Sequence, residues 1–294
     1  MLSTLNSVIT GALAMGNFGL EKAIYFQLIL LGVFVVATLV GYKLISNVPT
    51  LLHTPLMSGM NALSGVTVLG ALSASASLFK LGTAGIVLSA IFGSLAIALA
   101  MVNVVGGFMV TDRMLGMIAK KKAKGQTVIY AASAVAGAGL LAVICCMDVI
   151  AKGAGTSARD WVYLAMAIVL SLGVLLGIAM MGKVAYSKIG NRFSAICMLL
   201  AIILIIVYGN GTSHIAAVWT LYIGLALGTA AGIVLAKKVK MIQMPQMVAL
   251  LNGLGGAASA IVGAFAMLGV GTGFDAFSTT TSALALAVGM ITLI

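Results

Sequence analysis

The stretch FSAICMLLAIILIIVYG, residues 193–209, decides the fold class of this chain. It has no charged residue, and its length approaches the roughly 20 residues that a helix needs to cross about 30 Å of hydrocarbon. A membrane-spanning barrel strand would alternate polar and apolar positions, and this stretch does not. Because only helices and closed barrels satisfy their backbone hydrogen bonds in lipid, it predicts a transmembrane helix.

The composition of the whole chain leads to the same prediction. Of its 294 residues, 62% are hydrophobic and only 7% are charged, whereas soluble domains carry about 25% charged residues. Such a sequence cannot cover a water-facing globule. We therefore predict an all-α integral membrane protein without a soluble domain, a bundle of about nine transmembrane helices. The spans are expected at residues 26–46, 51–79, 83–108, 128–151, 160–183, 193–209, 214–236, 246–269 and 276–294.

A basic segment after the third span, with lysines at 120, 121, 122 and 124, divides the chain. The sequence ends at Ile294 within the last expected span, so we expect a fragment with a truncated rear section. The expected parts are an N-terminal surface segment (1–25), a three-span front section (26–110), a basic cytoplasmic linker (111–127) and a six-span rear section (128–294).

The net charge of +11 predicts an orientation and not a nucleic-acid partner, because no basic stripe carries interleaved aromatic residues. Cytoplasmic loops carry the excess of Lys and Arg. In the nine-span arrangement, the 16 basic residues fall unequally on the two sides of the membrane. The side richer in Lys and Arg is therefore predicted to be cytoplasmic, or the matrix in an organelle. We expect a multi-pass protein of the cell inner membrane, or of the mitochondrial inner membrane in a eukaryote. The richer side holds Lys43, Arg113, Lys120, Lys121, Lys122, Lys124, Lys183, Lys188, Arg192, Lys237, Lys238 and Lys240.

His53 is the only side chain within a predicted span whose pKa is ordinarily near neutral. With Pro49 as the first helical residue, Pro55 would lie inside the helix and kink it beside His53. At about 100° per residue, the His53 face also carries Met57, Met60, Ser64 and Thr67, with Asn61 at its edge. Ionisable groups inside membranes are usually functional, so this face is a candidate proton relay. The alternative is a structural histidine bonded to a backbone carbonyl.

Asn252 and Asn103 are further polar groups within predicted spans, and each is either an interhelical hydrogen bond or part of a proton path. Two rows of small residues favour close helix contacts, either static or sliding: Gly224, Gly228 and Gly232, and Gly255, Ser259 and Gly263. The sequence has no GxGxxG after a strand and no GxxxxGK[ST], HExxH or paired-cysteine motif. We therefore predict neither a nucleotide site nor a metal site on this chain.

Four longer motifs resemble the membrane section of the proton-translocating NAD(P) transhydrogenases. They are LHTPLMSGMNALSG (52–65), NVVGGFMVTDRML (103–115), GNRF (190–193) and LAKKVKMIQMPQMVALLN (235–252). The chain resembles the end of the alpha-type part of that section fused to the start of the beta-type part.

The resemblance implies a membrane component of an enzyme that transfers hydride between NADH and NADP⁺ while protons cross the membrane. It implies that NAD and NADP bind to partner domains, that this chain binds no cofactor, and that the complete enzyme is a homodimer. Many members carry their proton-carrying histidine where this chain has Asn252. Other members carry asparagine there and rely on the histidine that matches His53, so the resemblance assigns His53 as proton carrier. Candidates for the proton path are Asn252, Asn61, Ser64 and Asn103, and those for domain docking are Asp112, Arg113, Arg192, Lys237 and Lys238.

Two other functions remain open from the residues alone. A secondary transporter or channel subunit would need a substrate pocket with discontinuous helices, and few polar groups are predicted at membrane depth to form one. An inactive fragment would be consistent with the abrupt end of the sequence at Ile294.

Overall fold

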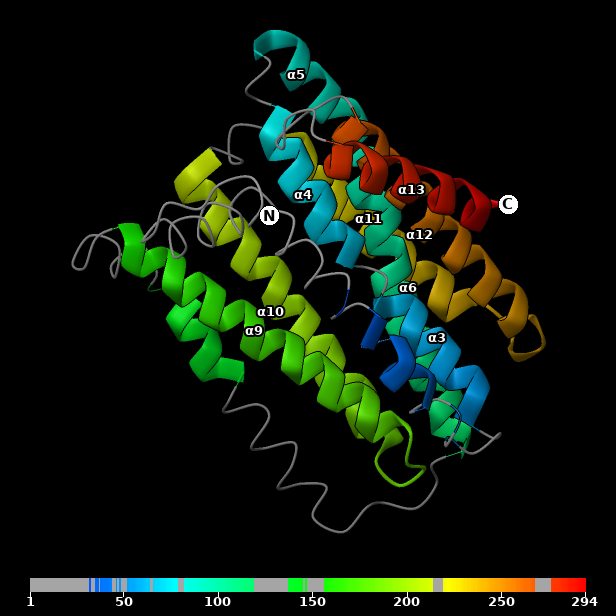
Figure 1. Ribbon diagram of the computed structural model, residues 1–294. Coiled ribbons are helices and arrows are strands. Elements are labelled where there is room, and N and C mark those ends of the chain that lie inside the picture. Colours follow the sequence, from blue (N-terminus) through cyan, green and yellow to red (C-terminus); the bar gives the residue numbers. More distant parts are fainter. Residues whose placement is uncertain are drawn as a thin grey trace.

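A computed structural model of the chain describes residues 52–63, 66–78, 82–118, 137–144, 156–213, 219–267 and 276–294, with Cys146 and parts of 32–48. All regular structure in these ranges is helical (Figure 1). The described chain is therefore an all-helical, multi-pass membrane protein. Helices long and apolar enough to cross a membrane cover Gly82–Ile118, Trp161–Met181, Ser187–Tyr208, Trp219–Lys238 and Met244–Met267.

The helices follow the predicted spans with some differences in their bounds. The first and fourth predicted spans, 26–46 and 128–151, lie largely outside the described residues, as do residues 1–25, so the count of nine stays a prediction. In chain order the elements are α3 (His53–Leu63), α4 (Val66–Leu78), α5 (Gly82–Leu88), the π-helical turn η3 (Ser89–Gly93), α6 (Ser94–Ile118), α9 (Thr156–Met181), α10 (Ser187–Ser213), α11 (Trp219–Lys238), the 3₁₀ turn η5 (Met241–Gln243), α12 (Met244–Met267) and α13 (Ala276–Leu293).

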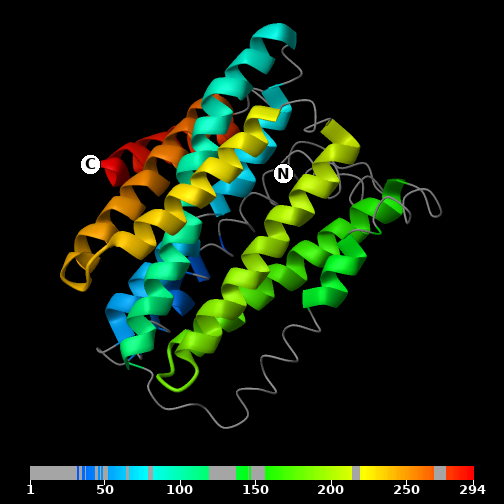
Figure 2. The same ribbon diagram turned by 180° about the vertical axis from the view of Figure 1, so that it is seen from behind.

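Helix α6 is the centre of the described bundle. It packs against α11, α12, α3, α10 and α4, while α9 pairs mainly with α10 and α13 with α12. Figures 1 and 2 show the α9–α10 pair on one side of α6 and the α12–α13 pair on the other. The largest apolar core lies between α4, α6, α10, α11 and α12, and its fully buried members include Val68, Ile97, Ala100 and Leu221.

Three buried glycines of α11 fit α11 closely against α6. A Cβ atom added to Gly224 would lie 2.6 Å from the Ser94 carbonyl oxygen, and one added to Gly228 would collide with the Ala98 carbonyl. One added to Gly232 would lie 3.1 Å from the Cβ of Val105. Since residue numbers rise together along the contact, the two helices run parallel. The first predicted row of small residues is thus a helix contact, and its partner is α6.

The second predicted row of small residues is only partly right. Gly263 and Gly256 lie against the backbone of α13, where Gly289 faces Gly256. Ser259 instead faces α4, and its hydroxyl lies 3.1 Å from that of Thr67. The difference arises because α12 packs against both α13 and α4. Some of the small residues of the row therefore face α13 and others face α4.

The predicted span 51–79 is described as two helices, α3 and α4, and Ser64 and Gly65 between them lie outside the described residues. The predicted kink at Pro55 is wrong. Helix α3 begins at His53, so Pro55 is its third residue. Backbone N–H groups in a first helical turn have no partner within the helix, and a proline there breaks no hydrogen bond.

Helix α6 extends to Ile118, so residues 111–118 of the predicted linker are helical. The sequence prediction ended this span at residue 108 because charged residues follow. Both charged residues have tertiary partners: Asp112 pairs with α10 and Arg113 bonds to α11. These contacts stabilise a helix end whose sequence is too polar for the hydrocarbon.

Candidate functional site

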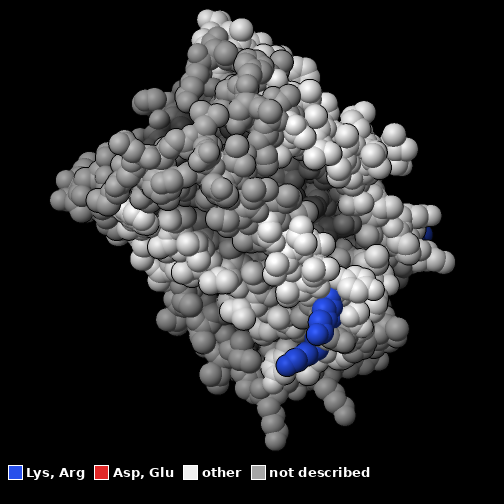
Figure 3. All heavy atoms as spheres, viewed as in Figure 1, with Lys and Arg blue, Asp and Glu red and all other residues white. Residues whose placement is uncertain are grey.

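The candidate site lies where the N-terminal ends of α3 and α10 meet the C-terminal ends of α6 and α11. Most basic residues assigned to the cytoplasmic side that fall in the described chain are on these helix ends or the turn before α10. In the space-filling view the described surface is largely uncharged, and the visible basic side chains lie at its lower and right-hand edges (Figure 3). This basic end holds all five residues proposed for docking, and His53 as well.

His53 is the first residue of α3 and is half-buried. Its Nε2 lies 3.0 Å from the carbonyl oxygen of Val48. A carbonyl can only accept, so Nε2 carries the hydrogen and the lone pair of the neutral ring is on Nδ1. The structural alternative predicted from the sequence, a bond to a backbone carbonyl, is therefore present, and it leaves Nδ1 able to take up a proton.

The packing of α3 against α6 determines where His53 lies along the length of the bundle. Ala62 lies against Gly107 and Gly59 faces Thr111, so the two helices are antiparallel. His53 precedes Gly59 by six residues, which places it about 9 Å closer to the basic end. His53 therefore lies near the cytoplasmic end predicted by the charges and away from the middle of the bundle.

Two of the remaining proton-path candidates, Asn103 and Asn252, lie apart from His53. Asn103 is fully buried in α6, and Asn252 is exposed on α12. Leu251 lies against Gly106, which puts Asn252 level with Ala62 and roughly 13 Å along the bundle from His53. Asn61 lies in α3 but its side chain is outside the described residues, and so is Ser64.

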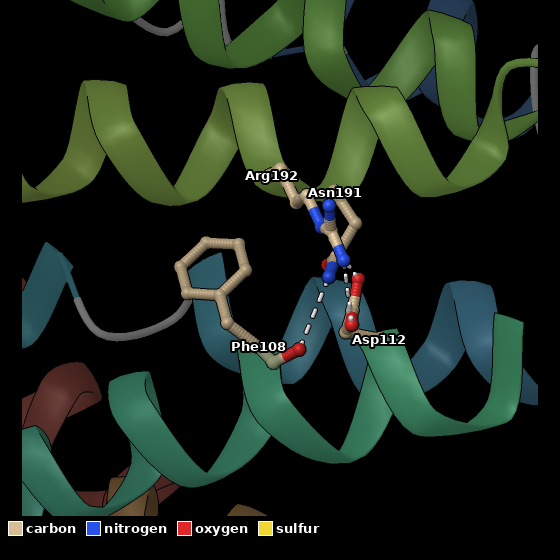
Figure 4. A network of polar contacts seen from close by, with 4 residues as sticks. All are labelled: Phe108, Asp112, Asn191 and Arg192. Atoms are coloured by element: carbon tan, nitrogen blue, oxygen red, sulfur yellow. Dashed lines mark hydrogen bonds and ion pairs between the residues drawn. The ribbon is translucent and has the colours of Figure 1, made fainter. Parts of the chain in front are cut away.

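Asp112 and Arg192, both proposed for docking, bind each other. Arg192 Nε lies 3.0 Å from Asp112 Oδ1, and its Nη2 lies 3.3 Å from Oδ2. The neighbouring Asn191 donates from its amide nitrogen to the Phe108 carbonyl at 3.0 Å (Figure 4). These contacts hold the N-terminal part of α10 against the last turns of α6. The ion pair is partly exposed, with 47% of the Arg192 side chain accessible.

Arg113 has a different environment from its neighbour. Its Nη1 donates to the carbonyl of Ala236 in the last turn of α11 and, at 3.1 Å, to that of Val239, which directly follows α11. Carbonyls in a last helical turn have no partner within the helix and carry partial negative charge, so a guanidinium is stabilising there. Arg113 thus joins α6 to α11. Lys237 and Lys238 are exposed on the last turn of α11.

No role was predicted from the sequence for Ser58, Thr111 or Asn191, although each lies in a motif that carried the resemblance. All three are buried near the basic end, at exposures of 0%, 0% and 1%. Ser58 lies inside a predicted span, so its hydroxyl was a signal that could have identified it, whereas Thr111 falls in the predicted linker and Asn191 falls between two predicted spans. The described residues contain no group of three or more His, Cys, Asp and Glu side chains placed to hold a metal ion.

Two family models match this chain. Residues 30–120 match the 4TM region of pyridine nucleotide transhydrogenase, and residues 163–294 match the NAD(P) transhydrogenase beta subunit. The chain belongs to the transmembrane section of the NAD(P) transhydrogenases. In the transhydrogenase section described here, His53, Asp112 and Arg113 fall in the first matched region, and Arg192, Lys237, Lys238 and Asn252 fall in the second.

Curated transhydrogenase relatives match the front of the chain. In Rhodospirillum rubrum, the protein named as the second part of NAD(P) transhydrogenase subunit alpha is 44% identical over 93 residues, which is 32% of this chain and 63% of that protein. The protein of the same name in Rickettsia prowazekii is 44% identical over 90 residues, covering 30% and 63%. Subunit alpha of Cereibacter sphaeroides is 44% identical over 88 residues, covering 30% and 16%. The chain thus spans less than two thirds of each relative.

Proposed function

We propose that this chain is the proton-conducting membrane component of an NAD(P) transhydrogenase. Partner domains bind NAD and NADP and transfer hydride between them, and protons cross the membrane through this chain. The observation that carries the proposal is the match of two transhydrogenase family models to successive parts of one chain whose described regular structure is all helical. Relatives named as alpha-subunit proteins in three bacteria support it.

The proposed layout keeps the predicted front section (26–110), linker (111–127) and rear section (128–294), with residues 111–118 of the linker forming the end of α6. It also keeps nine spans, with the basic end in the cytoplasm or matrix. Matches to one model over 30–120 and to the other over 163–294 support a fusion of alpha-type and beta-type parts. The complete enzyme is a homodimer of the inner membrane in this proposal.

His53 is the proposed proton carrier. Donation from Nε2 to the Val48 carbonyl fixes the ring and leaves Nδ1 as the atom that gains and loses the proton. For the proton to drive hydride transfer, its affinity for His53 has to differ between the nucleotide states of the partner domains. The position of His53 near the basic end supports this coupling, since a cytoplasmic domain could reach it without a relay across the whole membrane. Asn252, Asn103, Asn61 and Ser64 stay candidates for the rest of the path.

The proposed docking surface is narrower than the sequence suggested. Arg113 is bonded to carbonyls at the end of α11, so its proposed role is to position α11. Lys237 and Lys238 are exposed, and the Asp112–Arg192 pair lies at the same end of the bundle. An NADP-binding domain docking here would present acidic side chains to the two lysines.

The test uses His53 variants of the complete enzyme in proteoliposomes, with hydride transfer and internal pH recorded together. His53→Asn and His53→Gln cannot titrate, but their amide N–H can still donate to a backbone carbonyl. We expect both to lose proton movement while the partner domains still bind nucleotides. His214→Asn, at the other histidine of the chain, is the matched control and should pump normally. Unchanged proton movement in the His53 amide variants would refute the role of His53.

A further inference from the structure

Three buried polar atoms near the basic end have no hydrogen-bond partner among the described residues. They are the hydroxyl oxygens of Ser58 on α3 and Thr111 on α6 and the amide oxygen of Asn191 on α10. Their residues are 0%, 0% and 1% exposed. A buried polar atom without a partner loses its hydration and gains nothing in return, so native structures rarely leave one unsatisfied. Three of them at one helix junction require a common explanation.

Helix register brings Ser58 and Thr111 to the same level. Ala62 lies against Gly107, and α3 and α6 are antiparallel. One helical turn from that contact is Ser58 on α3 and Thr111 on α6, since residues four apart share a helix face. The methyl group of Thr111 lies 3.6 Å from the position of a Cβ on Gly59, next to Ser58, which agrees with this register.

Asn191 lies on α10, which packs against the same part of α6. Its amide nitrogen donates to the Phe108 carbonyl at 3.0 Å, and Phe108 is three residues before Thr111 on the same helix (Figure 4). Residues three apart are neighbours on a helix surface. The amide oxygen, which cannot donate, is therefore held beside the Thr111 turn with its acceptor positions unused.

The hydrogen-bonding capacity of the two hydroxyls and the amide oxygen indicates which kind of ligand they can bind. Two hydroxyls that can donate or accept and one oxygen that only accepts form a neutral set. A divalent cation would require about six oxygens including carboxylates, and the nearby carboxylate of Asp112 is paired with Arg192. A water molecule needs two to four polar partners of mixed kind. We propose that the junction of α3, α6 and α10 binds ordered water between Ser58, Thr111 and Asn191.

The proposed water joins three helices that belong to both matched family regions, since α3 and α6 lie in the first and α10 in the second. Ser58 follows His53 by five residues, so the water lies about 7 Å farther into the bundle along α3. It is placed to receive the proton from His53 on its way inward. This use of the water rests on the proposed function, but its binding rests on the packing alone.

Radiolytic footprinting of the full chain in nanodiscs tests the water site. X-rays convert ordered buried water into hydroxyl radicals, which oxidise the nearest methionine. Met181 packs against Gly59 beside Thr111, and Met198, equally buried at 2%, lies in the apolar core and is the matched control. We expect several-fold more oxidation of Met181 than of Met198. Equal oxidation of the two methionines in the unmodified chain would overturn the proposal.

Two variants test whether the hydroxyls of Thr111 and Ser58 bind the water. Thr111→Val keeps the side-chain shape, and Ser58→Ala is a milder change if the first variant fails to fold. Each should lower the oxidation of Met181 toward that of Met198, and unchanged oxidation in a folded variant contradicts the proposal. His53→Asn should leave the oxidation of Met181 unchanged, which separates this result from the proton-carrier test.

Discussion

Asp112 and Arg113 are adjacent in α6 but differ in how much they are expected to stabilise the fold. Asp112 forms a partly exposed pair with Arg192, in which water competes for both charges. Arg113 is half-buried and bonds carbonyls that have no partner within α11. Exposed ion pairs are worth about 0–1 kcal/mol, whereas hydrogen bonds to a charged group are worth about 1.5–3 kcal/mol.

Arg113→Ala is therefore expected to destabilise the chain more than Arg192→Ala. We expect a loss of about 1.5–3 kcal/mol for the first variant and less than about 1 kcal/mol for the second. Thermal unfolding in detergent, followed by tryptophan fluorescence, measures both against the unmodified chain. Equal midpoints for the two variants would show that the Arg113 contact with α11 contributes nothing specific.

At the scale of helices, the small-residue row of α11 determines how closely this helix approaches α6. Between membrane helices the hydrophobic effect is absent, so close packing supplies much of the association energy. Gly228 faces the backbone of Ala98, and a side chain there has no flexible neighbour to displace. Gly139, in the described helical stretch 137–144, is exposed and has open space around it.

This contrast predicts opposite effects of the same substitution. Gly228→Ala should destabilise the bundle by about 1–3 kcal/mol, because the added methyl group forces α11 away from α6. Gly139→Ala should be neutral or stabilising by up to about 1 kcal/mol, since alanine has the higher helix propensity. Thermal midpoints of the two variants give the comparison. A Gly228→Ala variant as stable as Gly139→Ala would contradict the close contact.

At the scale of the molecule, the parallel course of α6 and α11 puts their charged ends on one side. Lys237 and Lys238 end α11, whereas Trp219, 75% exposed, begins it. Trp161, 56% exposed, lies near the start of α9, whose other end leads into the basic turn before α10. Tryptophans at one end and lysines at the other are typical of spans that cross a bilayer with the basic end inside.

Impermeant thiol reagents test this orientation in a background without the native cysteines. Lys238→Cys should react only from the cytoplasmic or matrix side, and Trp219→Cys only from the opposite side, because the 20 residues of α11 span about 30 Å. Intact and inverted vesicles provide the two accessible faces. Reaction of both positions from one side would mean that α11 does not cross the membrane as proposed.

The helices and one of their contact faces could be predicted from the sequence, but the pairing of the helices could not. Long uncharged stretches predicted the helices, and small-residue spacing predicted a contact face on α11, since both depend on neighbouring residues in the chain. The partner of that face, α6, could not be predicted, because residues about 130 positions apart meet there. Pro55 was misjudged because the start of α3 was placed at Pro49, well before the observed start at His53.

By itself the sequence determined an all-helical membrane protein, its transhydrogenase resemblance and its only histidine in a predicted span, because length, hydropathy and ionisability belong to single residues and short stretches. Only the tertiary structure decided that His53 bonds the Val48 carbonyl, that Arg113 joins α6 to α11, and that polar atoms of Ser58, Thr111 and Asn191 are buried without a hydrogen-bond partner among the described residues. Those facts depend on which helices pack together and in which register. In lipid this is set by the close fit of small residues along whole helices, and a one-residue shift would change every contact.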